Sequence, residues 1–301
     1  MKRTIDNSVI GFIGTGVMGL SMAGHLLKNG FSLHVYSRTK AKAESLIQQG
    51  AIWHDSPASL AQAADVILTM VGYPKDVEDV YLGEHGVIHH VRPGSLLIDL
   101  TTSIPALAKE IERKALEREL QFLDAPVSGG DIGAREARLS IMVGGSEEAF
   151  ENAVPVLEVI GTTIVHQGPS GSGQYTKMCN QIAIAAKMVG VCESIKYAEA
   201  SGLDPATVLR SIEFGAAGSW TLSNLAPRII QEDYAPGFYV KHFIKDMQIA
   251  LDSSKELGLK LPGLSLARAL YEQLAEIGEE NSGTHALYKV YQYNQVPVLN
   301  A

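Results

Sequence analysis

The stretch that decides the fold is Val9-Ile10-Gly11-Phe12-Ile13-Gly14-Thr15-Gly16-Val17-Met18-Gly19, an apolar run that leads into G-x-G-x-x-G. This spacing alone is a weak signal, but here a strand pattern precedes it and a helical pattern, residues 21–27, follows it. Gly14 permits the tight turn, Gly16 lets the backbone approach a pyrophosphate, and Gly19 lets helix and strand pack closely. An ordinary strand–turn–helix is the alternative. We expect dinucleotide contacts from the whole turn: Gly14, Thr15, Gly16, Val17, Met18 and Gly19.

The second half of this pattern indicates which dinucleotide is bound. A short strand, residues 32–36, is followed by Ser37-Arg38-Thr39. An NAD site places a carboxylate at the end of this strand to accept from the ribose 2′-hydroxyl, whereas a guanidinium binds a 2′-phosphate. A solvated surface arginine is the alternative. The sequence therefore favours NADP over NAD, with Ser37, Arg38 and Thr39 around the phosphate.

Length and charge exclude several classes of protein. At 301 residues the chain is long enough for two domains, and its net charge of −8 with no basic run disfavours nucleic acid as a partner. No apolar stretch is long enough to span a bilayer, so we expect no membrane partner. We find no spacing typical of a metal site.

The expected compartment is the cytoplasm. The start Met1-Lys2-Arg3 faintly resembles a signal peptide, but its apolar continuation is the glycine-rich strand itself. Cys179 and Cys192 are the only cysteines and lie in one helical stretch, where they cannot pair. We expect both to be buried and reduced.

Strand and helix patterns alternate through the first half of the chain. Later strands are expected at residues 66–71, 95–100, 121–125, 139–143 and 163–166, with helices such as 105–118 and 147–157 between them. Their β-branched, unpatterned runs are typical of strands buried on both faces. The fold class that this predicts is α/β: a Rossmann-type, doubly wound, mostly parallel sheet.

The second half has no convincing strand and predicts an all-α domain. A helix is expected from about residue 170 to residue 201, and its middle, residues 182–189, is apolar on nearly every face. Such a helix is expected to be buried all round, between domains or against a second subunit. We therefore predict a cofactor domain at residues 1–168, a substrate and dimerisation domain at residues 169–301, and a homodimer or homotetramer.

Three further segments carry candidate substrate-binding or catalytic residues. Ser128-Gly129-Gly130 follows a predicted strand and offers a hydroxyl and approachable amides to a small carboxylate, or else is a plain turn. Lys177 shares a helix face with Asn180 and Gln181, and a buried lysine at a helix start suits acid–base work; a lysine whose head reaches water is equally consistent. Lys245-Asp246 is either part of the site or a solvated helix surface.

Together these motifs resemble the β-hydroxyacid dehydrogenase family, which includes 3-hydroxyisobutyrate dehydrogenase and tartronate semialdehyde reductase. The resemblance extends from Gly11 to about Gln292 and rests on G-F-I-G-x-G-x-M-G, D-A-P-V-S-G-G, G-x-x-G-x-G-x-x-x-K-x-x-N and K-D, in that order. Their joint occurrence is highly specific, although none is so alone.

The resemblance implies a role for each matching residue. Lys177 corresponds to the catalytic lysine and Asn180 to its neighbour in the site, while Thr101 and Thr102 match the loop on the nicotinamide side of the cofactor. The substrate-binding set is Ser128, Gly129, Gly130, Asn180, Lys245 and Asp246, and Lys245 is also expected to contact the cofactor. Two residues depart from the family pattern: many members carry Asn at the position of His25, and some carry a second Asn at the position of Gln181.

The expected reaction is the NADP-dependent interconversion of a small 3-hydroxy acid and its semialdehyde or oxo acid. Lys177 would protonate the developing alkoxide. Reduction of glyoxylate, succinic semialdehyde or tartronate semialdehyde is the alternative. Imine reductases resemble this architecture but typically lack the lysine, and 6-phosphogluconate dehydrogenases need a larger helical domain. A catalytically silent NADP-sensing module is the rival from outside the enzymes.

Overall fold

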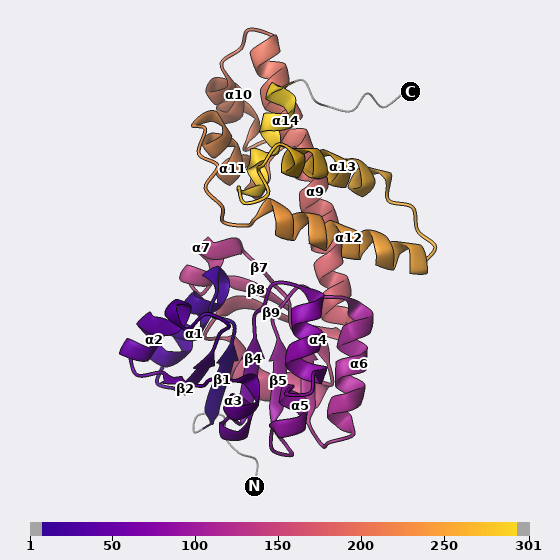
Figure 1. The fold of residues 1–301 in the computed structure, drawn as a ribbon. Coiled ribbons are helices and arrows are strands. Elements are labelled where there is room, and N and C mark those ends of the chain that lie inside the picture. Colours follow the sequence, from indigo (N-terminus) through magenta and orange to yellow (C-terminus); the bar gives the residue numbers. More distant parts are fainter. Residues whose placement is uncertain (1–7, 294–301) are drawn as a thin grey trace. The chain divides into compact units, whose positions relative to one another are not determined.

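The computed structural model describes residues 8–293, so Met1-Lys2-Arg3 lies outside the described part. The chain divides into two compact units, which meet along the sequence at Lys177 and Met178. The first unit is a mostly parallel sheet covered by helices, and the second is helical (Figure 1). This confirms the predicted fold class.

Within the described residues, nine strands form the sheet of the first unit. They are β1 (Val9–Ile13), β2 (Ser32–Tyr36), β3 (Ile52–Trp53), β4 (Val66–Thr69), β5 (Leu96–Asp99), β6 (Gln121–Asp124), β7 (Val127–Ser128), β8 (Leu139–Gly145) and β9 (Gly161–Gly168). The strand order is β3-β2-β1-β4-β5-β6-β8-β7, and β9 also pairs with β8. The first six strands run parallel in the order typical of dinucleotide-binding folds, whereas β8 is antiparallel to β6 and β7.

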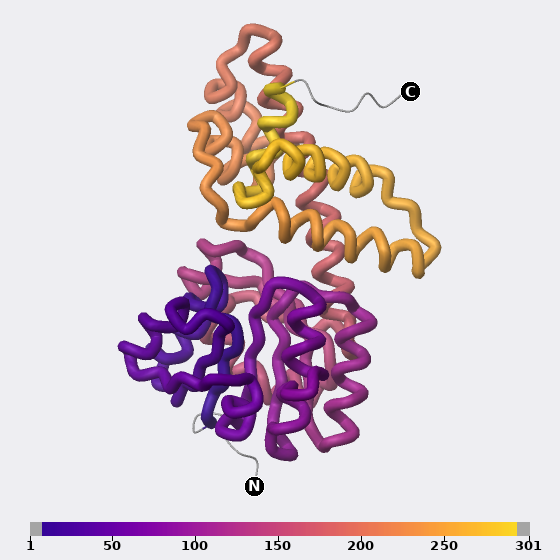
Figure 2. Tube along the Cα trace, viewed as in Figure 1, coloured from indigo at the N-terminus to yellow at the C-terminus, as the bar shows by residue number. Residues whose placement is uncertain are grey.

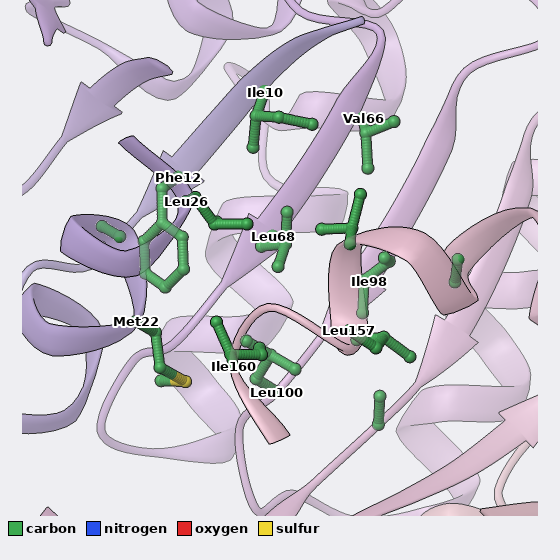
Figure 3. Packing of buried hydrophobic residues seen from close by; sticks show 14 of the residues in the cluster. Ile10, Phe12, Met22, Leu26, Val66, Leu68, Ile98, Leu100, Leu157 and Ile160 are labelled. Atoms are coloured by element: carbon green, nitrogen blue, oxygen red, sulfur yellow. The ribbon is translucent and has the colours of Figure 1, made fainter. Parts of the chain in front are cut away.

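The central strands bury side chains on both faces of the sheet, as their unpatterned sequences predict. Ile10, Phe12 and Leu68 point to one face, where they pack with Met22 and Leu26 of a helix in the apolar core shown in Figure 3. Alternate residues of the same strands, Ile13 among them, belong to a second core on the other face. Two covered faces explain why the strands read as continuous apolar runs.

Helices occupy the connections between the strands. In the first unit they are α1 (Val17–Lys28), a 3-10 turn η2 (Lys40–Ala43), α2 (Glu44–Gln48), α3 (Pro57–Ala63), α4 (Pro74–Leu82), α5 (Val87–His90), α6 (Pro105–Leu116), α7 (Gly130–Arg135) and α8 (Glu147–Leu157). Proline begins α3, α4 and α6, where its missing N–H costs no helical hydrogen bond.

Within this single chain, the long helix α9 (Ser172–Ala200) is buried on one face and exposed on the other, so the predicted burial all round would need a second subunit. Gln181, Ala185 and Met188 are buried on one face, whereas Ala183 and Gly190 are exposed on the other. Its small residues give little polarity to either face, so sequence periodicity cannot reveal the asymmetry. The same asymmetry corrects the expectation for the cysteines: Cys192 is buried, but Cys179 is exposed, and both are free thiols.

The second unit contains the remainder of α9 and the helices that follow. They are α10 (Pro205–Ile212), α11 (Trp220–Ile230), α12 (Val240–Glu256), α13 (Pro262–Glu276), the 3-10 turn η3 (Thr284–Leu287) and α14 (Tyr288–Gln292). α12 and α13 run side by side, as Figure 2 shows. Phe243 and Tyr271 meet edge to face between them in the core of this unit.

Several short elements were not predicted. β3 and β7 have two residues each and α7 has six, too few to produce a readable periodicity. α11 includes Pro227 in its interior. No helix within residues 8–293 is long and apolar enough to cross a membrane, and no cluster of potential metal ligands occurs in that same range.

Candidate active site

The glycine-rich turn has the local geometry that a dinucleotide needs. Gly14 has a φ of 98°, and a Cβ there would lie 2.2 Å from the carbonyl oxygen of Met70. A Cβ on Gly19 would lie 1.9 Å from the carbonyl oxygen of Gly14, so only glycine allows this packing. A Cβ on Gly16 would meet nothing within 4 Å. Gly14 and Gly19 are therefore required by the fold, while the space at Gly16 suits a ligand that approaches the backbone.

The start of α1 fits an anionic group. It begins at Val17, has no acidic residue in its first turn, and exposes unpaired amides with the positive end of the helix dipole. The hydroxyl of Thr15 is buried and, among the described residues, has no hydrogen-bond partner. A ligand that reaches this hydroxyl would supply its missing partner. These residues fit a bound dinucleotide pyrophosphate.

Arg38 follows β2 and is mostly exposed, with 79% of its side-chain surface accessible. Its Nη1 lies 2.9 Å from Oδ1 of Asp76, in the first turn of α4. The other carboxylate oxygen of Asp76 accepts from the backbone N–H of Tyr73. The arginine is thus directed by an anchored carboxylate rather than buried, and its exposed head can meet an anion at the carboxyl end of β2.

Thr101 is fixed in the loop that follows β5. Its N–H donates to Oδ1 of Asp99 at 3.0 Å, and its hydroxyl accepts from the N–H of Val71 at 3.0 Å. Asp99 also accepts from the hydroxyl of Thr69, which is bonded to the hydroxyl of Tyr81. This network joins the ends of β4 and β5. Thr102, the next residue, is half-buried.

Two carboxyl groups at adjacent strand ends have raised pKa values. Burial raises the pKa of Asp99 to about 7, although hydrogen bonds from Thr101 and Thr69 oppose the shift. Burial raises the pKa of Asp124, at the end of β6, to about 6, against the backbone N–H groups of Gly171 and Gln174. Both groups therefore change charge near neutral pH.

The Ser128-Gly129-Gly130 segment is a short strand that turns directly into a helix. Ser128 lies in β7 opposite Ser140 of β8, and α7 begins at Gly130. Gly129 has a φ of 133° and Gly130 a φ of 63°, backbone conformations that side chains disfavour. Gly129 is exposed and Ser128 is half-buried. The glycines thus bring backbone rather than side chains to the surface beside Ser128.

Lys177 is buried, with 7% of the residue exposed. Its Nζ donates to the carbonyl oxygen of Val127 at 2.9 Å, which places the amine beside Ser128. A lysine whose head reaches water is therefore the wrong alternative. Within the first unit, the structure brings together the predicted acid and the predicted carboxylate loop.

The remaining predicted residues form a second polar cluster within the helical unit. The side-chain amide of Asn180 donates to Oε1 of Gln181 at 2.7 Å, and the amide of Gln181 donates to Oδ2 of Asp246 at 2.6 Å. Nζ of Lys245 lies 2.9 Å from Oδ1 of Asp246, with side-chain exposures of 13% and 2%. Lys245-Asp246 is thus not a solvated surface pair. Gln181 is fully buried and connects Asn180 to Asp246.

Sequence reasoning missed several residues that hold this site together. Asp99, Asp124 and Gln174 are fully or almost fully buried and bond to the segments that carry the predicted residues. In each case the position of the residue in the sequence could have indicated its role. The two aspartates end apolar strands, and Gln174 precedes Lys177 by three residues, which places both on one side of a helix.

Two family models match almost the whole described chain. Residues 9–168 match the NAD-binding domain of 6-phosphogluconate dehydrogenase, and residues 171–291 match the NAD-binding region of NADP-dependent 3-hydroxyisobutyrate dehydrogenase. The site and the fold therefore define an NAD(P)-binding oxidoreductase.

Similar proteins point the same way. An uncharacterized oxidoreductase of Bacillus subtilis, YkwC, is 60% identical over 97% of this chain and 99% of its own. A probable 3-hydroxyisobutyrate dehydrogenase-like protein of Arabidopsis thaliana, named mitochondrial, is 46% identical over 94% of this chain and 85% of its own. An NAD-dependent L-serine dehydrogenase of Pseudomonas aeruginosa is 35% identical over 95% and 98%.

A solved structure agrees in sequence and fold. The 3-hydroxyisobutyrate dehydrogenase of Mycobacterium tuberculosis, solved with L-serine, has a TM-score of 0.87 at 29% identity and covers 95% of this chain and 99% of its own. The chain belongs to the 3-hydroxyisobutyrate dehydrogenase family of NAD(P)-dependent hydroxyacid dehydrogenases. This confirms the family that the four motifs predicted.

Proposed function

We propose that the protein is an NADP-preferring dehydrogenase that interconverts a small 3-hydroxy acid and its semialdehyde or oxo acid. The observation that carries this proposal is the buried Lys177 amine, held by the carbonyl of Val127 beside Ser128. A positively charged amine next to approachable backbone offers a proton donor and an anion-binding surface within one small volume. A sensing module without catalysis needs no proton donor at this position.

The roles follow from the chemistry of each group. When bound, the nicotinamide supplies the hydride that adds to the substrate carbonyl. Lys177 donates a proton to the substrate oxygen as negative charge develops there. Ser128, Gly129 and Gly130 bind the substrate carboxylate with a hydroxyl and backbone amides. Asn180 orients the substrate.

The polar pair of the helical unit completes the proposed set. Lys245 carries a charge that suits an anionic substrate or the cofactor, and Asp246 holds that charge in place at 2.9 Å. Gln181 secures Asp246 from the other side, so the longer side chain at this position supports the pair. Gln181 therefore has a role in holding Asp246, and the proposal does not need its amide to contact the substrate.

The proposed cofactor site follows the ends of the parallel strands. Gly14 to Gly19 bind the pyrophosphate, Ser37, Arg38 and Thr39 bind the 2′-phosphate, and Thr101 and Thr102 contact the nicotinamide side, as does Lys245. Arg38 supports NADP over NAD because no carboxylate occurs among residues 37–39. The relatives' names include both cofactors, so this preference rests on the residues of this chain.

Assembly and division of labour form a separate part of the proposal. Residues 1–168 bind the cofactor, and residues 169–301 serve the substrate and a homodimer or homotetramer in the cytoplasm. One face of α9 is exposed in the single chain and includes Tyr197, of which 74% is exposed. This face supports a contact with a second copy. Light scattering of the purified protein measures this directly, and a monomer at all concentrations would contradict it.

The experiment is a substrate screen of the purified protein. NADPH oxidation is followed with methylmalonate semialdehyde, tartronate semialdehyde, succinic semialdehyde and glyoxylate, and NADP reduction with 3-hydroxyisobutyrate and L-serine. We expect the highest kcat/KM with methylmalonate semialdehyde, and a preference for another aldehyde would favour the reductase alternative. Tight NADPH binding without turnover of any of these compounds would support the sensing module.

A further inference from the structure

Gln174 has an unusual place among the polar residues of the first unit. Its side chain is fully buried on the first turn of α9, where an apolar residue would be the common choice. Both ends of its amide are used. Oε1 accepts from the N–H of Ser103 at 2.9 Å, and Nε2 donates to the carbonyl of Thr101 at 2.8 Å. The side chain thus pairs with the loop after β5 as a neighbouring strand would.

The loop after β5 depends on the side-chain amide of Gln174, because two of the loop's backbone groups have no other partner among the described residues. Thr101 and Ser103 are 1% and 2% exposed, so water cannot satisfy their backbone groups. Within residues 8–293, no other backbone group bonds to the carbonyl of Thr101 or to the N–H of Ser103. A buried backbone group that loses its partner costs free energy, and an isosteric apolar residue at position 174 would orphan two of them.

The backbone of Gln174 is also fixed, close to Lys177, the proposed acid. Its own N–H donates to Oδ2 of Asp124 at 2.8 Å, and the N–H of Gly171 donates to Oδ1 at 2.7 Å. Lys177 lies three residues further along the same helix, on the same side and one turn higher. One rigid turn of α9 therefore links the carbonyl of Thr101 to the amine of Lys177.

The order of strands indicates what this loop faces. β1, whose end carries the glycine turn, lies between β2 and β4, and β5 follows β4. Arg38 at the end of β2 suits the phosphorylated ribose, so the other half of an extended dinucleotide lies on the side of β4 and β5. Thr101 is held there through its N–H by Asp99 and through its hydroxyl by Val71.

We infer that Gln174 is a positioning residue that ties the nicotinamide-side segment Thr101–Ser103 to the turn of α9 that carries Lys177. It fixes the separation between the hydride donor and the proton donor without touching either reactant. This inference rests on the proposed function, because it takes Thr101 as a contact of the cofactor and Lys177 as the acid.

The first test compares two ligands on the Gln174→Met variant, which keeps the volume and removes both hydrogen bonds. NADPH carries the nicotinamide, whereas 2′,5′-ADP has the 2′-phosphate and lacks that ring. We expect the Kd for NADPH to rise about 10-fold, from the loss of two hydrogen bonds. The Kd for 2′,5′-ADP should change less than about 2-fold. An equal loss for both ligands, or for neither, would overturn the inference.

A second readout concerns the reaction itself. With a displaced nicotinamide, hydride transfer should become slower than product release, so the primary isotope effect on kcat with C4-deuterated NADPH should increase in Gln174→Met. Tyr271→Phe is the matched control, since it removes a buried hydrogen bond to Thr284 within the helical unit. Its melting temperature should fall to a comparable degree, while its ligand ratio and isotope effect should equal those of the wild type.

The Gln174→Glu variant gives a signature that no general loss of stability produces. The introduced carboxyl is buried, so its pKa should be raised, and its protonated form can again donate to the carbonyl of Thr101. NADPH affinity relative to 2′,5′-ADP should therefore recover as the pH falls from about 8 to about 5.5. The wild type measured at each pH accounts for the charged groups around this position, Asp99, Asp124 and Lys177. A pH-independent ratio in this variant would contradict the inference.

The two levels of the proposal fail in different ways. A wild-type protein that binds neither NADPH nor 2′,5′-ADP would contradict the proposed function. A wild type that binds both, beside Gln174 variants with an unchanged ratio and isotope effect, would contradict only the positioning role.

Discussion

The proposed preference for NADP depends on one residue in the turn after β2. Arg38 is exposed and held by Asp76, so its guanidinium is available to a 2′-phosphate. Replacing it by aspartate should weaken NADPH binding by about 2 to 4 kcal/mol, because a charge-assisted contact becomes a repulsion, while NADH binding should change little. Fluorescence titration with both cofactors measures this.

The matched control for this variant is Arg92→Asp. Arg92 is also paired with an aspartate, Asp65, at 2.8 Å, but the two residues precede β5 and β4, at the opposite edge of the sheet. The same change of charge there should leave both affinities unaltered. Equal kinetic constants for NADPH and NADH in the unmodified protein would contradict the role of Arg38.

Gly129 tests the proposed substrate carboxylate site. A valine at this position is strained at a φ of 133°, and its Cβ would lie 3.3 Å from Leu139 and 3.5 Å from Gly133, so the backbone beside Ser128 should shift and the substrate KM should rise at least about 10-fold while cofactor affinity stays the same. Gly94→Val is the control, because Gly94 has a φ of 80° and lies before β5 at the other edge of the sheet. A normal KM for every active substrate in Gly129→Val would exclude this loop as the anion site.

At the scale of elements, the ends of β5 and β6 carry buried carboxyl groups that make the stability of the fold depend on pH. Burial raises the pKa of Asp99 to about 7, above its value of about 4 in an unfolded chain. The folded state therefore keeps this proton to higher pH, and stability falls as the pH rises through the interval from 4 to 7. Asp124, with a pKa of about 6, adds to the same trend.

The Asp99→Asn variant should flatten this dependence. The amide oxygen of the asparagine can accept from Thr101 and Thr69, and the side chain stays neutral at every pH. Between pH 4 and pH 8, the free energy of unfolding of the variant should therefore rise relative to that of the wild type by up to about 4 kcal/mol. Thermal melts of both proteins across this range measure the difference, with each kcal/mol worth about 2 to 4 °C. Parallel curves would show that Asp99 does not titrate in the folded protein.

The elements also show what could be predicted from the sequence. The long parallel strands and helices were placed within a few residues, because burial on two faces and helical periodicity leave clear patterns. β7 and α7 could not be predicted, since the pairing of Ser128 with Ser140 and the start of a helix at Gly130 depend on tertiary contacts. The face of α9 that is exposed in the single chain could not be predicted, because alanine and glycine suit both a core and a surface.

At the scale of the whole molecule, the candidate site was partly predictable. Lys177, Asn180 and Lys245-Asp246 were chosen from residue type and spacing together with the family resemblance, and the structure buries Lys177, Lys245 and Asp246 largely or fully and half-buries Asn180. The residues that hold them, Gln174 and Gln181, were not chosen as such, because their partners lie many positions away in sequence: Thr101 and Ser103 for the first, Asp246 for the second.

The central claim is that the molecule is a dehydrogenase with Lys177 as its proton donor, and steady-state kinetics of Lys177→Ala and Lys177→Arg test it most directly. Lys177→Ala should lower kcat about 100-fold or more with little change in the Kd for NADPH. Lys177→Arg should be nearly as slow, since a guanidinium keeps the charge but does not release its proton near neutral pH. A near-normal kcat in Lys177→Arg would show that the residue acts only as a fixed charge, and a near-normal kcat in Lys177→Ala would contradict the account altogether.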